Sequence, residues 1–84
     1  MEKERFVTER ILLGKRITQL RNKCINKDTG KPISQEELGL RVGLVKNHIG
    51  LIERGQTNTT VEALFGIAKE LNVNIKMLFN FEEI

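Results

Sequence analysis

Residues 34–55 read SQEELGLRVGLVKNHIGLIERG, and this stretch decides the fold. Ser34 is followed three residues later by Glu37, and this capping box predicts a helix that begins at Gln35. Gly43 can adopt the left-handed backbone conformation that ends a helix, so we expect this helix to stop there after barely two turns.

A second short helix is expected after Gly43. Apolar residues keep one face, and Gly55 supplies the next glycine terminator, which predicts a helix of about residues 45–54. The apolar positions are Leu44, Ile49 and Ile52. Two very short helices joined at a glycine pack as a rigid unit that displays the second helix outward. The sequence therefore predicts a helix-turn-helix over about residues 34–54.

The chain before this unit is expected to form a first helix and a loop. Apolar residues at helical spacing place the helix at about residues 8–24, with Phe6 and Cys24 on its apolar side. Residues 25–33 are rich in turn formers and lack periodic apolar residues, which predicts an exposed loop. Cys24 is interpreted as a small core hydrophobe.

Two further helices are expected after the unit. Thr59 with Glu62 forms a second capping box, which predicts a fourth helix, and Asn74 is expected to cap a short fifth one. The fold class is therefore all-α, a compact bundle of five helices. We expect a single domain over residues 1–84, with its core in about residues 8–80.

Composition is ordinary for a folded chain. The 84 residues are 39% hydrophobic and 30% charged, which excludes a disordered tail. A single cysteine cannot form an intrachain disulfide, and residues 1–5 are too charged for a signal peptide, so we expect a cytoplasmic protein. No window approaches the run of about 18 apolar residues that a membrane span needs.

The net charge of +3 is unevenly placed. Residues 1–31 hold nine Lys and Arg against four Asp and Glu, whereas residues 32–84 hold five against seven. This basic surplus fits a polyanionic partner, because Lys and Arg neutralise phosphates, and it fits a solvated helix face equally well.

No catalytic, metal or cofactor site is expected. One His and one Cys cannot supply the ligands of a zinc site. The sequence shows no nucleophile with an identifiable base and no glycine-rich phosphate loop. We therefore expect neither an enzyme nor a small-molecule ligand.

Several positions share the pattern of one known family. They are SQEEL at 34–38, Gly43, Ile49 and IERG at 52–55. The pattern extends from LGKRI at 13–17 through AKEL at 68–71 to Phe79. With these residues, the chain resembles the lambda-repressor and Cro-like, or XRE-type, helix-turn-helix DNA-binding family. The resemblance implies a lambda-repressor-like fold and a sequence-specific transcriptional regulator, of the repressor kind, that binds double-stranded DNA.

The resemblance also implies how the chain would meet DNA. Gln35 would hydrogen-bond a phosphate, and Lys46 and Asn47 would read base edges from the exposed face of the third helix in the major groove. Lysine suits the guanine O6 and N7 acceptors, and asparagine can bond adenine in a bidentate manner. Further reading positions would fall at Gly50 and Leu51.

Some of these positions depart from the family pattern. Gly50 has no side chain, Leu51 could touch only a thymine methyl, and Val45 stands where relatives often carry a capping serine or threonine. His48 is either a phosphate donor or an exposed residue without a role. The loop residues after Gly55 either contact phosphate or serve as plain turn residues; they are Gln56, Thr57 and Asn58.

Two structural expectations also come from the resemblance. Arg21 is expected to form an ion pair with Glu53, which would fix the first helix against the recognition helix. Thirteen positions separate Arg21 from Ser34, more than relatives usually have. The lysines of this insertion could reach flanking phosphate, or the insertion is a tolerated surface loop; they are Lys23, Lys27 and Lys31.

Assembly and role remain with alternatives at this stage. The resemblance implies a homodimer on a palindromic operator, with recognition helices about 34 Å apart. The apolar carboxy-terminal residues form the dimer surface or cap the monomer core; they are Leu78, Phe79, Phe81 and Ile84. Phage repressor, restriction-modification controller and antitoxin roles all fit. The rival hypothesis is an interaction module, antitoxin-like or an adaptor, that keeps the scaffold with weak or lost DNA specificity.

Overall fold

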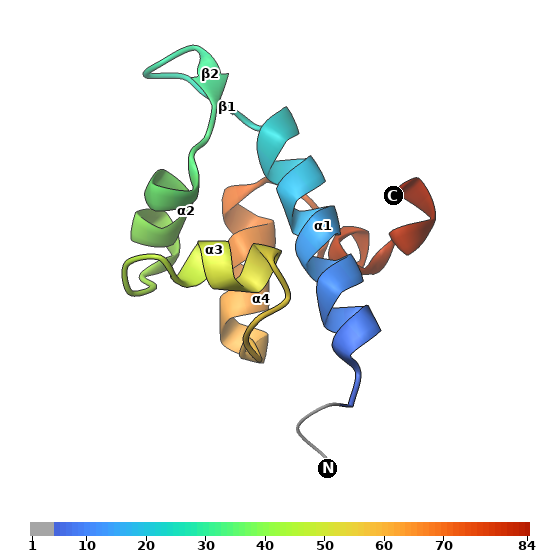
Figure 1. Ribbon diagram of the computed structural model, residues 1–84. Helices are drawn as coiled ribbons and strands as arrows, with labels where there is room; N and C mark the ends of the chain where they lie inside the picture. The colour runs from blue at the N-terminus through green and yellow to red at the C-terminus, as the bar shows by residue number, and fades with distance from the viewer. Residues whose placement is uncertain (1–4) are drawn as a thin grey trace.

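The computed structural model describes residues 5–84. Its α-helices are α1 (Val7–Lys23), α2 (Gln35–Val42), α3 (His48–Glu53) and α4 (Val61–Glu70). A two-stranded antiparallel hairpin, β1 (Ile25–Asn26) and β2 (Lys31–Pro32), joins α1 to α2. Two 3₁₀ segments, η2 (Ile75–Phe79) and η3 (Phe81–Glu83), end the chain (Figure 1).

The second helix begins and ends where the sequence predicts. The Ser34 hydroxyl accepts a hydrogen bond from the Glu37 amide at 3.0 Å, and Gly43 takes the left-handed conformation with φ 83°. The Glu37 carboxylate does not complete the capping box, because it accepts from Arg41 Nε at 2.8 Å instead. This hydrogen bond raises the pKa of Arg41 and keeps its guanidinium charged.

The prediction of five helices is wrong in its last element. The Asn74 side chain accepts from the Lys76 amide at 3.1 Å, so the cap forms, but the segment that follows is a 3₁₀ turn of five residues. Short segments commonly adopt this tighter helix, and its Leu78 side chain is fully buried. The C-terminal part of the chain is therefore a pair of 3₁₀ turns packed on α1 and α4.

The prediction of a plain loop over residues 25–33 is also wrong. Ile25 pairs with Pro32 and Asn26 pairs with Lys31 in antiparallel register. Turn residues alone predicted the exposed tip correctly, but two-residue strands are too short to produce an alternating pattern. The segment 26–31 is exposed or half-buried throughout.

Two other expectations at helix starts are wrong. Phe6 is 60% exposed and has a left-handed backbone just before α1, so it does not join the apolar face. The cap of α4 is Thr60, whose hydroxyl accepts from the Ala63 amide at 3.0 Å, and not Thr59. Since α4 begins at Val61, only Thr60 has its oxygen within reach of the third helical amide.

The core lies where α1, α2, α3 and α4 meet. Its buried hydrophobic side chains are Ile17, Leu20, Ile33, Leu38, Ile49, Ile52, Ile67, Ala68, Leu71 and Leu78. Cys24 packs against the edge of this cluster as a half-buried free thiol. None of the helices in residues 5–84 has both the length and the apolar character needed to cross a bilayer.

Glycine at position 14 sets how closely α1 crosses α3. A Cβ there would lie 2.3 Å from the Glu53 carbonyl oxygen and 2.5 Å from that of Ile52. The two helix backbones are therefore in direct contact, which places α3 on the side of the bundle formed by α1 and α2 (Figure 1).

Candidate nucleic-acid interface

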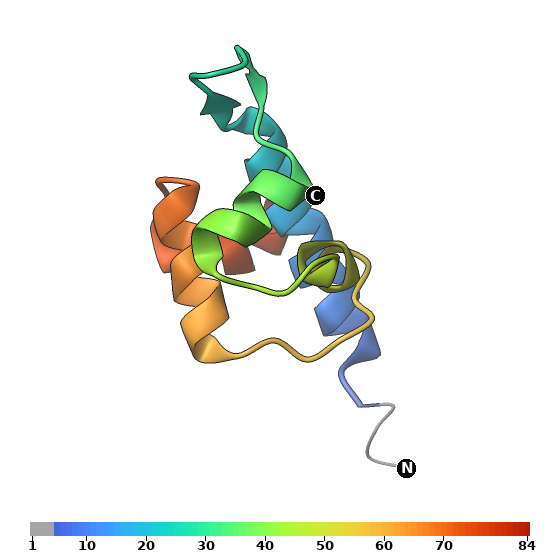
Figure 2. The same cartoon turned by 90° about the vertical axis from the view of Figure 1, so that its left-hand side faces the viewer.

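The two short helices and the turn between them form one side of the molecule. Figure 2 shows α2 running down to this turn and α3 seen nearly end-on beside it. The Gly43 and Leu44 amides both donate to the Gly39 carbonyl, each at 2.9 Å, which closes the turn after α2. This arrangement is the helix-turn-helix geometry expected from the sequence.

The third helix is shorter than predicted. It spans His48–Glu53, so Lys46 and Asn47 lie in the turn before it and not on its first face. Asn47 has φ 69°, a left-handed conformation that asparagine adopts more readily than most residues, and its side chain does not cap the helix. Val45 has no capping oxygen to begin the helix three residues earlier. Lys46 and Asn47 are both exposed.

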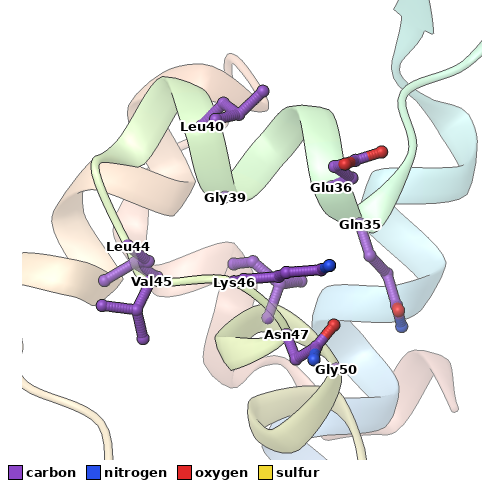
Figure 3. Close-up of a pocket in the computed structure, with 10 residues that line it drawn as sticks. Gln35, Glu36, Gly39, Leu40, Leu44, Val45, Lys46, Asn47 and Gly50 are labelled. Atoms are coloured by element: carbon purple, nitrogen blue, oxygen red, sulfur yellow. The ribbon is translucent and has the colours of Figure 1, made fainter.

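An open hollow brings the predicted reading residues together. It lies between α2 and the turn, and its lining includes Gln35, Lys46, Asn47 and Gly50. Figure 3 shows Lys46 and Asn47 extending from the turn across this hollow in the direction of Gln35. Groups able to donate to phosphate and to base edges thus share one concave surface.

A network of partly buried polar groups ties this surface to α1. Arg21 donates from Nε to Glu53 Oε2 at 2.6 Å and from Nη2 to Oε1 at 3.1 Å. Gln35 Nε2 also donates to Glu53 Oε1, at 2.7 Å. The Arg21 and Glu53 side chains are only 13% and 4% exposed, so the pair is well shielded from solvent. Glu53 therefore connects the starts of two elements, α2 and the hairpin exit, to the end of α3.

Gly50 makes room for the Gln35 side chain. A Cβ at this buried glycine would lie 3.3 Å from Gln35 Oε1 and 3.1 Å from Arg54 Nη1. The missing side chain thus lets the Gln35 amide lie across α3 and reach Glu53. His48, the first residue of α3, and Leu51 are both half-buried on this helix.

The loop after α3 extends the same side of the molecule. Gln56 and Asn58 are exposed, and Thr57 is half-buried with its hydroxyl donating to the Asn58 carbonyl at 3.2 Å. Arg54 Nε donates to Gln56 Oε1 at 3.0 Å. The sequence analysis did not select Arg54, although an exposed arginine next to the recognition helix is itself a signal for phosphate contact.

The predicted apolar surface at the carboxy terminus is divided by the structure. Leu78 is fully buried in the core, so its inclusion in a dimer surface is wrong. Phe79 and Ile84 are 49% and 45% exposed, and Phe81 is half-buried. The rings of Phe79 and Phe81 lie 6.4 Å apart in a tilted pair.

Comparison with known proteins agrees with this geometry. A helix-turn-helix family model matches residues 33–78, more than half of the chain. The chain belongs to the XRE-type helix-turn-helix family. The resemblance inferred from the sequence is thereby confirmed.

Relatives of this XRE-type chain include named regulators. The control protein C.BamHI of Bacillus amyloliquefaciens is 33% identical over 75 residues, which are 89% of this chain and 85% of that protein. An uncharacterized HTH-type transcriptional regulator of Archaeoglobus fulgidus is 35% identical over 51 residues, 61% of this chain and 72% of the relative. Its fold is similar to that of the restriction-modification controller protein C.AhdI from Aeromonas hydrophila, with TM-score 0.72, 30% identity and coverage of 86% and 98% of the two chains.

Proposed function

We propose that this protein is a transcriptional regulator that binds a specific sequence of double-stranded DNA in the cytoplasm, without catalysis. The observation that carries the proposal is the single hollow that holds Gln35, Lys46 and Asn47. These three residues come from the start of α2 and from the turn before α3, and the exposed side of α3 lies next to them. Membership in a DNA-binding family supports the same proposal.

The proposed binding mode divides positioning from reading. Gln35 hydrogen-bonds a phosphate at one edge of the major groove, and the loop residues Gln56, Thr57 and Asn58 meet phosphates at the other edge. Between these contacts, Lys46 and Asn47 reach base edges, and each good bidentate contact discriminates by roughly 1–3 kcal/mol. Because the turn precedes α3, the amino-terminal end of the helix enters the groove first.

We further propose that the regulator acts as a homodimer on a palindromic operator and represses by occupying it. Phe79, Phe81 and Ile84 offer an apolar surface for the partner copy. The names of C.BamHI and C.AhdI support a role in controlling the expression of a restriction-modification system.

A specific observation favours a second candidate function. Leu40 and Val45 line the same hollow and are 71% and 74% exposed. Large exposed apolar side chains are unusual where phosphate and base edges are to be met, and they are common in surfaces that dock another protein. An interaction module that has lost DNA specificity would use this hollow for a protein partner.

Selection of bound sequences from a pool of random duplexes distinguishes the two. We expect enrichment of a palindromic motif by the wild-type protein and loss of enrichment with Lys46→Ala, Asn47→Ala. The matched control is Lys69→Ala, Asn22→Ala, which removes the same residue types outside the hollow and should leave the motif unchanged. Weak binding of all sequences by every variant would contradict the proposal and favour the interaction module.

A further inference from the structure

The hairpin between α1 and α2 is an ordered element. The Gly30 and Thr29 amides donate to the Asn26 carbonyl at 2.8 and 3.2 Å, and the Asp28 amide donates to Asn26 Oδ1 at 2.9 Å. The Lys31 amide donates to Thr29 Oγ1 at 3.2 Å, and Gly30 takes φ 74° to close the turn. Every one of these bonds is local, so the tip holds its shape without help from the rest of the fold.

The base of the hairpin is fixed to the groups that position the candidate interface. Ile33 is fully buried, and its amide donates to the Cys24 carbonyl at 2.8 Å, which closes the base of the hairpin. Arg21 Nη1 donates to the Ile33 carbonyl at 2.9 Å while the same guanidinium holds Glu53. Gln35, bonded to that same Glu53, follows two residues after Ile33. The hairpin therefore has a defined position relative to Gln35 and to the end of α3.

The charge of this element is strongly positive. Lys23, Lys27 and Lys31 are all exposed, and Asp28 is the one acidic residue from position 23 to position 33. The printed ion pairs do not involve these lysines. Figures 1 and 2 both show the hairpin standing beyond the start of α2, at the end of the molecule opposite the amino terminus.

We propose that this hairpin, defined here as residues 24–33, binds the phosphate backbone of the same duplex outside the segment read in the major groove. The inference rests on the proposed function, because it requires DNA already held by the interface. Extended chain advances about 3.3 Å per residue, so the tip at Asp28 lies at most roughly 20 Å from Gln35. DNA rises 3.4 Å per base pair, and the added contacts therefore fall within about six base pairs of the phosphate that Gln35 meets.

Duplex length and salt provide the test. The selected motif is placed in a short duplex that ends at its outermost base pairs and in a long duplex with ten further base pairs on each side. Wild-type protein should bind the long duplex more tightly, and Lys27→Ala, Lys31→Ala should remove this advantage while leaving affinity for the short duplex unchanged. Lys69→Ala, Lys76→Ala, which removes the same charge from α4 and η2, should keep it.

Salt dependence gives the expected magnitude. Each phosphate contact contributes about 0.9 to the slope of log affinity against log salt, so two lost contacts lower the slope by about 1.8. Between 50 and 200 mM salt, wild-type affinity for the long duplex should fall about 12-fold more than that of the hairpin variant. Equal slopes, or equal length dependence for both proteins, would overturn the inference while tight binding of the short duplex left the proposed function standing. Failure of wild type to prefer the motif in either duplex would refute both.

Discussion

Replacing Gly14 by alanine tests how α1 supports the recognition helix. The added Cβ would lie 2.3 Å from the Glu53 carbonyl oxygen, and real Cβ contacts essentially never fall below 3.0 Å. The obstacle is backbone at the end of α3, so no side-chain rotation can relieve it. α1 and α3 must therefore separate, which disturbs the packing of buried neighbours such as Ile17 and Ile52.

The expected cost follows from two opposing effects. Overpacking a well-packed site costs about 1–3 kcal/mol, and a rigid backbone obstacle belongs at the upper end. Alanine regains about 1 kcal/mol of helix propensity over glycine. We expect Gly14→Ala to lower the free energy of unfolding by roughly 2 kcal/mol and the melting temperature by about 8–16 °C.

Gly39→Ala is the matched control. Its Cβ would lie 3.5 Å from Ile49 Cγ1, an ordinary contact, so the propensity gain of about 1 kcal/mol should appear as added stability. The expectation that this glycine was needed for close approach of α2 and α3 is thus wrong. Thermal and urea unfolding followed by circular dichroism measure both variants. A Gly14→Ala protein as stable as wild type would refute the reasoning.

Three other predictions concern single side chains. Glu53→Ala should cost about 3 kcal/mol in urea unfolding, because it leaves the Arg21 charge unpaired, whereas Arg21→Met with Glu53→Leu should cost much less; equal costs would contradict the pairing argument. Thr59→Val should add about 1 kcal/mol of stability, since the buried Thr59 hydroxyl has no hydrogen-bond partner within residues 5–84, while Thr60→Val should remove about 1 kcal/mol with the cap of α4; the same sign for both would be inconsistent with this assignment. Arg16→Met should speed hydrogen exchange in η2 and η3, because Arg16 Nε donates to an η2 carbonyl at 2.8 Å, and unchanged exchange would show that this bond does not hold the segment.

The sequence predicts α2 well because its limits depend on local chemistry. Ser34 and Gly43 act through bonds within three or four residues, which a sequence pattern contains in full. The start of α3 could not be predicted in this way. Val45 offers no cap, and the left-handed Asn47 has its place set by how the turn packs between α2 and α3.

Long-range contacts explain most of what the sequence analysis missed. Arg16 is 2% exposed and bonds a carbonyl 61 positions away, at Met77, and no local pattern marks an arginine for burial. Gly14, in contrast, was a usable signal, since a glycine inside a helix often marks close approach of another backbone. The placement of Gln35 against Glu53 likewise depends on the absence of a side chain at Gly50.

The account places sequence reading in the turn before α3, and one titration tests this most directly. Fluorescence anisotropy at fixed salt compares affinity for the selected motif with affinity for a scrambled duplex of the same composition. Wild-type protein should prefer the motif by a factor on the order of 10³ or more. Lys46→Ala, Asn47→Ala should lose at least about 30-fold of this preference and little of the affinity for scrambled DNA. An unchanged ratio in the double variant would show that these residues do not read the sequence.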